Sequence, residues 1–170
     1  MLEFLQECDS NNMYNRAHDC ELHLNAFNCL TPIATFFEVT FKALYSEFFP
    51  NRSFEQSLNL YDLLHEKEFV DCLKTDLDFS SIHVVDMIRK KSNELKHSEN
   101  AQPINADDRK NYFRCLFNFC ASYYLWRTGK KKPSWDDSLY NNFLIDDHAR
   151  KLVESELSDR ISDLARLIVK

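Results

Sequence analysis

The sequence predicts an all-α protein: a helical bundle followed by one further amphipathic helix. The 170 residues include a single glycine. Sandwiches, barrels and doubly wound folds need many turn positions with positive φ, which glycine adopts most easily. Apolar residues recur at spacings of three and four along most of the chain, which is the period of a helix with one buried face. The hydrophobic share of 44% is too high for a disordered chain.

Composition also excludes several classes of function. The dinucleotide, P-loop and hydrolase-elbow motifs each need at least two glycines, so none can occur here. The chain has no apolar stretch of about 18 residues and no signal peptide at its start, so we expect a cytoplasmic protein with no membrane partner. No cysteine pair forms CxxC, and we expect reduced thiols, no metal and no cofactor. The cysteines are Cys8, Cys20, Cys29, Cys72, Cys115 and Cys120.

Two helices are predicted in the first third of the chain. The first spans about 13–24, with Ala17 and Glu21 at helical spacing. The second spans about 30–49 and is the most hydrophobic. Thr31 followed by Pro32 suits its start, with the threonine as N-cap.

Three further helices are predicted. Ser53 and Gln56 form a capping signal for a helix that carries Leu58, Tyr61, Leu64 and Phe69. The next begins at Ser80 or Ser81 and ends near His97. After a polar loop over 99–106, Asp107 or Asp108 caps a helix that Gly129 ends.

The remaining chain differs in kind. Residues 1–128 are predicted to form the bundle, 129–146 a linker, and 147–170 the amphipathic C-terminal helix. Its narrow apolar stripe suits a coiled-coil seam, and two interpretations stay open: the helix packs back on the bundle, or it pairs with a partner helix. The stripe consists of Ala149, Leu152 or Val153, Leu157, Ile161, Leu164 and Ile168.

The most distinctive motif lies on the predicted helix that ends near His97. Arg89, Asn93 and His97 are each four residues apart, so they share one face of the helix. The run Ile88-Arg89-x-x-Ser92-Asn93-x-x-x-His97 resembles the signature of HEPN-like helical domains. The nearest version is the one at the N-terminus of type I restriction endonuclease R subunits and related bacterial defence helicases.

The resemblance extends over about residues 1–128. Ala17-x-x-x-Glu21 resembles the family's early helix, and Glu38 before an apolar run resembles its second. One departure is that the arginine usually found just before that glutamate is here Ala34 or Thr35.

The resemblance implies one of two roles. Active HEPN proteins are metal-independent endoribonucleases, in which Arg89, Asn93 and His97 would be the catalytic residues. However, Arg89 and His97 are eight residues apart, a rise of about 12 Å. Ser92 stands where the RNxxxH form carries arginine. We therefore favour a degenerate, non-catalytic member, in which Asn93 and His97 cap and hydrogen-bond the helix end and Arg89 pairs with an acid such as Glu38 or Glu21.

Two basic clusters are candidate nucleic-acid contacts, since lysine and arginine beside aromatic residues bind phosphates and bases. The alternative is a solvated helix end. Cys8, Cys20, His18 and His23 fit no known zinc spacing. The cluster residues are Lys90, Lys91 and Lys96 in the first, and Arg127, Lys130, Lys131 and Lys132 in the second.

These features predict a non-catalytic scaffolding or regulatory module at the N-terminus of a larger restriction or defence helicase-nuclease. Its expected partners are the helicase and nuclease domains of the same polypeptide or complex, a second copy of the chain, and RNA or DNA. The alternative functions are a HEPN endoribonuclease that uses Arg89 and His97, and a nucleic-acid-binding module without chemistry.

Overall fold

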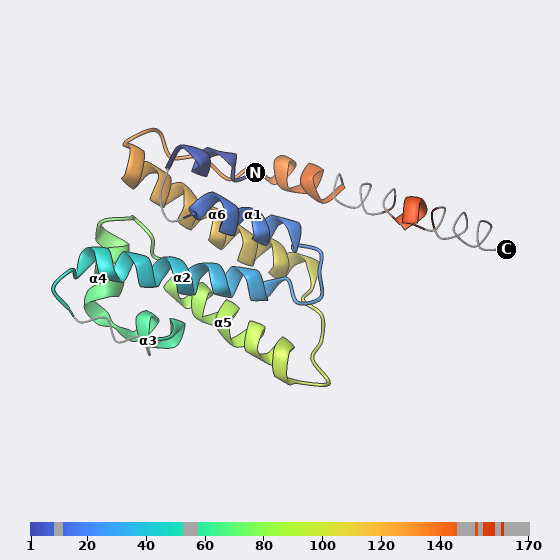
Figure 1. Ribbon diagram of the computed structural model, residues 1–170, viewed down its shortest axis with the longest axis horizontal. Coiled ribbons are helices and arrows are strands. Elements are labelled where there is room, and N and C mark those ends of the chain that lie inside the picture. The colour runs from blue at the N-terminus through green and yellow to red at the C-terminus, as the bar shows by residue number, and fades with distance from the viewer. Residues whose placement is uncertain (9–11, 53–57, 146–151, 153–154, 159–160, 162–170) are drawn as a thin grey trace. The chain divides into compact units, whose positions relative to one another are not determined.

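The computed structural model describes residues 1–8, 12–52, 58–145, 152, 155–158 and 161, and every regular element in them is helical (Figure 1). The all-α prediction is therefore confirmed. One compact unit comprises Leu2–Trp135, and the residues from Asp136 onward belong to a second unit. The elements of the first unit are η1 (Glu3–Cys8), α1 (Met13–Leu22), α2 (Leu30–Phe48), α3 (Leu60–His65), α4 (Lys67–Thr75), α5 (Ile82–His97) and α6 (Ala106–Thr128).

Helix α2 is the centre of the first unit. It contacts α1 and α6 on one side and α3, α4 and α5 on the other (Figure 1). Its wide apolar face explains this position, because Phe36, Phe37 and Phe41 are almost completely buried. Phe119 of α6 lies within 5.4 to 6.0 Å of these three rings, measured between centroids, and Phe79 approaches it to 5.1 Å. These edge-on contacts are the geometry that aromatic rings prefer, and they form the core.

The starts of three helices differ from the sequence predictions. Helix α2 begins at Leu30, because successive turns over 23–31 lead directly into it, so Thr31 is not its N-cap. Helix α3 begins with a capping box between Asn59 and Asp62, and the predicted signal at Ser53 lies outside the described residues. The N-cap of α6 is Asn105, which accepts a hydrogen bond from the Asp108 backbone N–H.

Two other local predictions have clear outcomes. The single helix expected after Ser53 is divided into α3 and α4 at Glu66, whose extended backbone ends α3 and whose side chain caps α4. By contrast, Ser81 and Gly129 lie where the sequence places them, at the start of α5 and the end of α6. Gly129 has a φ of 66°, which a residue with a side chain adopts only with strain.

The second unit includes helical residues where a linker was expected. Residues 137–145 are helical, as are Leu152, 155–158 and Ile161. Leu152, Leu157 and Ile161 belong to the predicted apolar stripe, and each is more than half exposed. The other stripe residues lie outside the described part of the chain.

Candidate functional site

A groove in the first unit brings together much of the motif that the sequence singled out. It has a volume of about 390 Å³ and lies where α2, the start of α3 and the second half of α5 meet. The α5 residues that line the groove, from Arg89 to Lys96, lie on one face of the helix. This is the face that the four-residue spacing of Arg89 and Asn93 predicts. The lining residues are Ala34, Thr35 and Glu38, then Asn59, Leu60 and Tyr61, and then Arg89, Ser92, Asn93 and Lys96.

Arg89 is held by its own helix and by α3. Its Nε donates to Asp86 Oδ1 at 2.9 Å, and its Nη2 lies 2.8 Å from the same oxygen. Its guanidinium carbon is 5.1 Å from the centre of the Tyr61 ring, a distance typical of a cation–π contact. An acid does bind Arg89, as predicted, but that acid is Asp86, one turn earlier, and not Glu38 or Glu21. Glu38 instead binds Lys42 at 2.7 Å.

Asp86 is the anchor of this arrangement. Its second oxygen lies 2.7 Å from Lys90 Nζ. Partial burial alone would raise the pKa of Asp86, but the hydrogen bonds from Lys90 and Arg89 outweigh it, and the pKa is lowered from 3.8. The carboxylate thus stays charged at neutral pH and keeps Arg89 oriented.

His97 does not share the groove with Arg89. Among the described residues that line the groove, the α5 contribution ends at Lys96, and His97 is exposed as the last residue of the helix. A rise of about 12 Å separates Arg89 from His97 along the axis. A ribonuclease of the expected kind needs the imidazole and the guanidinium on one phosphate, and here they lie apart.

The predicted capping role of Asn93 and His97 is wrong. In the described residues neither side chain makes a hydrogen bond, and the Ser98 backbone N–H binds the Glu94 carbonyl at 3.0 Å. The backbone therefore already satisfies the Glu94 carbonyl at this end of the helix. Asn93 is an exposed amide that lines the groove.

Most residues of the two basic clusters have acidic partners. Lys91 binds Glu94 at 2.8 Å, and Lys132 lies 3.3 Å from Asp78. Arg127 binds Glu47 and also donates to the Tyr123 hydroxyl, while Lys130 binds Glu7. In the part of the chain that the structure describes, only Lys96 and Lys131 of the seven cluster residues have no such partner.

The aromatic residues beside the second cluster take part in packing. Trp126 is half-buried, with its ring 5.8 Å from Phe48, and Arg127 lies over it at 4.3 Å. Trp135 contacts Phe117 edge-on at 5.4 Å. These rings are therefore not free faces on which bases could stack.

The cysteines lie in the core or at its margin. Burial raises the pKa of Cys115 to about 12 and raises that of Cys120 well above its usual range, so both are protonated thiols. Five of the six are buried, and Cys72 is the intermediate one. Within the described ranges no group of three or more potential ligands could hold a metal ion.

Two charged residues of α1, Glu21 and Arg16, have surroundings that the sequence did not predict. Glu21 is buried at 2% exposure and accepts a hydrogen bond from the Leu2 backbone N–H at 3.1 Å, with His18 also 3.1 Å away. Arg16 is partly buried and lines a second cavity. The sequence signal for their burial was weak: each charged residue is next to an apolar position of α1, Arg16 beside Ala17 and Glu21 beside Cys20.

Comparisons of the chain with protein-family models, curated proteins and solved structures find no match. No helix in the described residues is long and apolar enough to cross a membrane.

Proposed function

We propose that this chain is a non-catalytic scaffolding or regulatory module of a larger bacterial restriction or defence helicase-nuclease. One observation carries the proposal: Arg89 is engaged by Asp86 and Tyr61, and His97 lies outside the groove that Arg89 lines. A general acid–base site would need both groups on one substrate. The link to defence proteins rests on the resemblance of the Arg89–His97 motif to HEPN-like domains.

The groove's composition supports protein contacts as its role. It presents a cation at Lys96, a carboxylate at Glu38, an amide at Asn93 and a half-exposed ring at Tyr61. Mixed charge with one aromatic residue is typical of a surface that binds another protein, whereas a phosphate backbone favours uniformly positive charge. Most residues of the two basic clusters already pair with acidic side chains, which lowers their contribution to nucleic-acid binding.

The exposed apolar residues of the second unit support the same role. Leu152, Leu157 and Ile161 are helical and each is more than half exposed. An apolar stripe on a charged helix packs against another helix, and such contacts assemble multidomain proteins. Homodimerisation stays a prediction.

A cleavage assay with the whole chain tests the proposal against the endoribonuclease. Structured and single-stranded RNAs are incubated with the wild-type chain and with His97→Ala, in the presence of a metal chelator. We expect no cleavage above the buffer control for either protein. Chelator-resistant cleavage that leaves a cyclic phosphate and is lost in His97→Ala would show that the chain is an enzyme.

A second assay tests the groove in the full native protein. Lys96→Glu reverses the unpaired charge in the groove, and we expect it to reduce protection against phage by about 10-fold or more. His97→Ala and the control His83→Ala, an exposed α5 position outside the groove, should leave protection unchanged. Protection lost in His97→Ala but kept in Lys96→Glu contradicts the proposal.

A further inference from the structure

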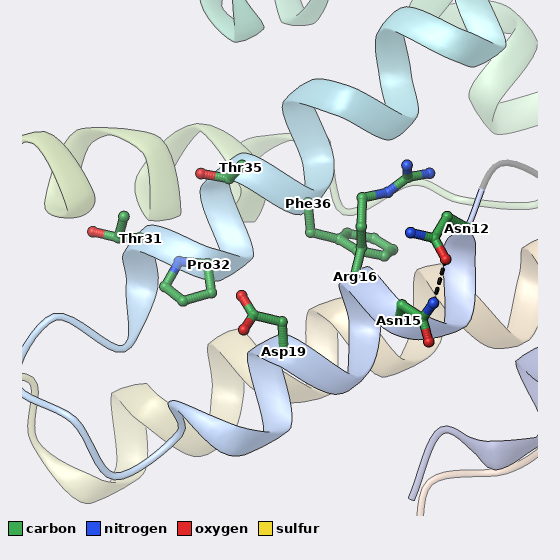
Figure 2. Close-up of a pocket in the computed structure, with 8 residues that line it drawn as sticks. All are labelled: Asn12, Asn15, Arg16, Asp19, Thr31, Pro32, Thr35 and Phe36. Carbon is green, nitrogen blue, oxygen red and sulfur yellow. Dashed lines mark hydrogen bonds between the residues drawn. The ribbon is translucent and has the colours of Figure 1, made fainter.

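A second cavity lies between α1 and the start of α2. It has a volume of about 360 Å³, which is within the range of small-molecule sites. Figure 2 shows Arg16 extending from α1 on the side that faces α2, with Asn12 and Asn15 at the start of α1. Thr31, Thr35 and Phe36 line the cavity from α2. Thr35 also lines the groove beside α5, so the two cavities share this residue.

Among the described residues, the guanidinium of Arg16 has no acceptor. Its Nε and Nη2 are buried from solvent and have no hydrogen-bond partner. The side chain as a whole is only partly buried, and it lines the cavity. Buried polar atoms in folded proteins nearly always have partners, and a buried charge without one is costly.

No carboxylate among the described residues pairs with this charge. Burial lowers the pKa of Arg16, and the Tyr123 hydroxyl opposes this effect. Asp19 also lines the cavity, with its side chain pointing toward Pro32 in Figure 2, and its Oδ1 lies 3.3 Å from His23 Nδ1. Among the described residues, Arg16 is therefore a partly buried cation without an anionic partner.

The remaining lining residues suit an oxyanion. Asn12 is the N-cap of α1 with a φ of 57°, and its side chain does not cap the helix. It accepts a hydrogen bond from Asn15 instead. The hydroxyl of Thr35 and the amides of these asparagines can donate to phosphate oxygens, and Phe36 and Pro32 offer apolar surface for an attached organic group.

We propose that the cavity between α1 and α2 binds a small phosphorylated molecule, whose phosphate pairs with Arg16. Arginine is the side chain best suited to phosphate, since its planar donors match the oxygens. The bound phosphate would supply the counter-charge that Arg16 does not find among the described residues. This site is separate from the proposed scaffolding role and does not depend on it.

The test measures thermal stability and affinity with inorganic phosphate and with adenosine monophosphate as probes. Sodium chloride at equal ionic strength and sodium acetate are the controls. We expect the melting temperature of the wild-type chain to rise by several degrees with a phosphate probe, as saturation of a native-state site requires. If only inorganic phosphate raises the melting temperature, free phosphate is the ligand. If adenosine monophosphate binds more tightly than inorganic phosphate, the organic group also occupies the cavity. An equal rise with acetate, or no rise beyond that with chloride, overturns the proposal.

Arg16→Met removes the charge and keeps the length of the side chain. We expect its affinity for the effective probe to fall by about 10-fold or more. Without ligand, its melting temperature should equal or exceed that of the wild type, because an unpaired buried charge is removed. Lys74→Met, an exposed position of α4 outside the cavity, should behave as wild type with both probes.

A lower melting temperature of Arg16→Met without ligand would show that Arg16 has a structural role and would overturn the proposal. If Arg16→Met fails to fold, Arg16→Lys and the wild-type chain still test the proposal. The lysine keeps the charge without the planar donors, so it should weaken binding and keep the fold. In the wild type, the NMR signal of Arg16 Nε–H should shift during titration with the effective probe, and an unchanged signal contradicts binding at this site.

Discussion

At the scale of single residues, Asp86 decides the chemistry of the candidate site. It binds both Arg89 and Lys90, and it is only 20% exposed. A guanidinium that already has a carboxylate partner and a ring contact is poorly available to a substrate phosphate. Sequence spacing placed Arg89 correctly on its helix face but did not identify this partner, which is three residues earlier, on the preceding turn.

The lowered pKa of Asp86 predicts a pH-dependent contribution to stability. A carboxyl group whose pKa is lower in the folded chain than in the unfolded chain stabilises the fold above its unfolded pKa. That contribution is lost as the pH falls below about 3.8 and passes through the folded pKa. Asp86→Asn should therefore lower the free energy of unfolding by about 1 kcal/mol at pH 7, since the ion pairs are partly exposed.

The measurement is urea denaturation of both proteins at several pH values from 7 to 3. The difference in unfolding free energy between Asp86→Asn and the wild type should shrink below pH 4. Asp71→Asn, an exposed position of α4, is the control. A difference that stays constant down to pH 3 would mean that the ion pairs of Asp86 do not stabilise the fold.

At the scale of elements, side-chain caps mark the starts of α3, α4 and α6, whereas α1, α2 and α5 begin without one. Helix α6 starts at Asn105, whose Oδ1 accepts from the Asp108 backbone N–H at 2.8 Å. Helix α3, with six residues, has a complete capping box at Asn59 and Asp62. The predicted caps at Asp107 or Asp108 were close to this position, but several polar residues in a row can each cap a helix, and packing selects among them.

Replacement of the α6 cap should destabilise the fold measurably. Asn105→Ala removes the acceptor of an otherwise unpaired backbone N–H, and we expect a loss of about 1 kcal/mol in unfolding free energy. Asn105→Asp keeps the acceptor and should be close to wild type. Thermal denaturation followed by circular dichroism measures both, and equal losses in the two variants would argue against a capping role.

At the scale of the whole molecule, an aromatic core joins helices that are distant in the sequence. Phe119 of α6 contacts rings of α2, the ring of Phe79 before α5, and Tyr123. The groove beside Arg89 and the cavity beside Arg16 both have α2 as a wall. Because the core fixes α2, it also determines the shape of both candidate sites.

Removal of the Phe119 ring should affect the entire first unit. Phe119→Ala leaves a large cavity, and we expect a loss of about 3–5 kcal/mol in unfolding free energy. Phe119→Leu should lose less, because it fills part of the space. Phe27→Ala, at a ring that is 54% exposed, is the control and should change little. The measurement is denaturant unfolding, and similar losses in Phe119→Ala and Phe27→Ala would contradict this account of the core.

Much of the fold could be predicted because it depends on local patterns. The spacing of apolar residues identified α1, α2, α5 and α6, and Gly129 marked the end of α6. The division at Glu66 could not be predicted, because α3 and α4 together carry one uninterrupted helical pattern. Their separation reflects where each helix packs against α2, which is a long-range effect.

By itself, the sequence determined the helical class, the approximate extents of the main helices and the common face of Arg89 and Asn93. These follow from the period of the helix and from the near absence of glycine. Only the tertiary structure decided which charges find partners. It paired Arg89 with Asp86, separated His97 from the groove and left Arg16 partly buried, with no acceptor among the described residues. The physical reason is that a charge's environment depends on neighbours from other turns and helices, and no spacing along one helix records them.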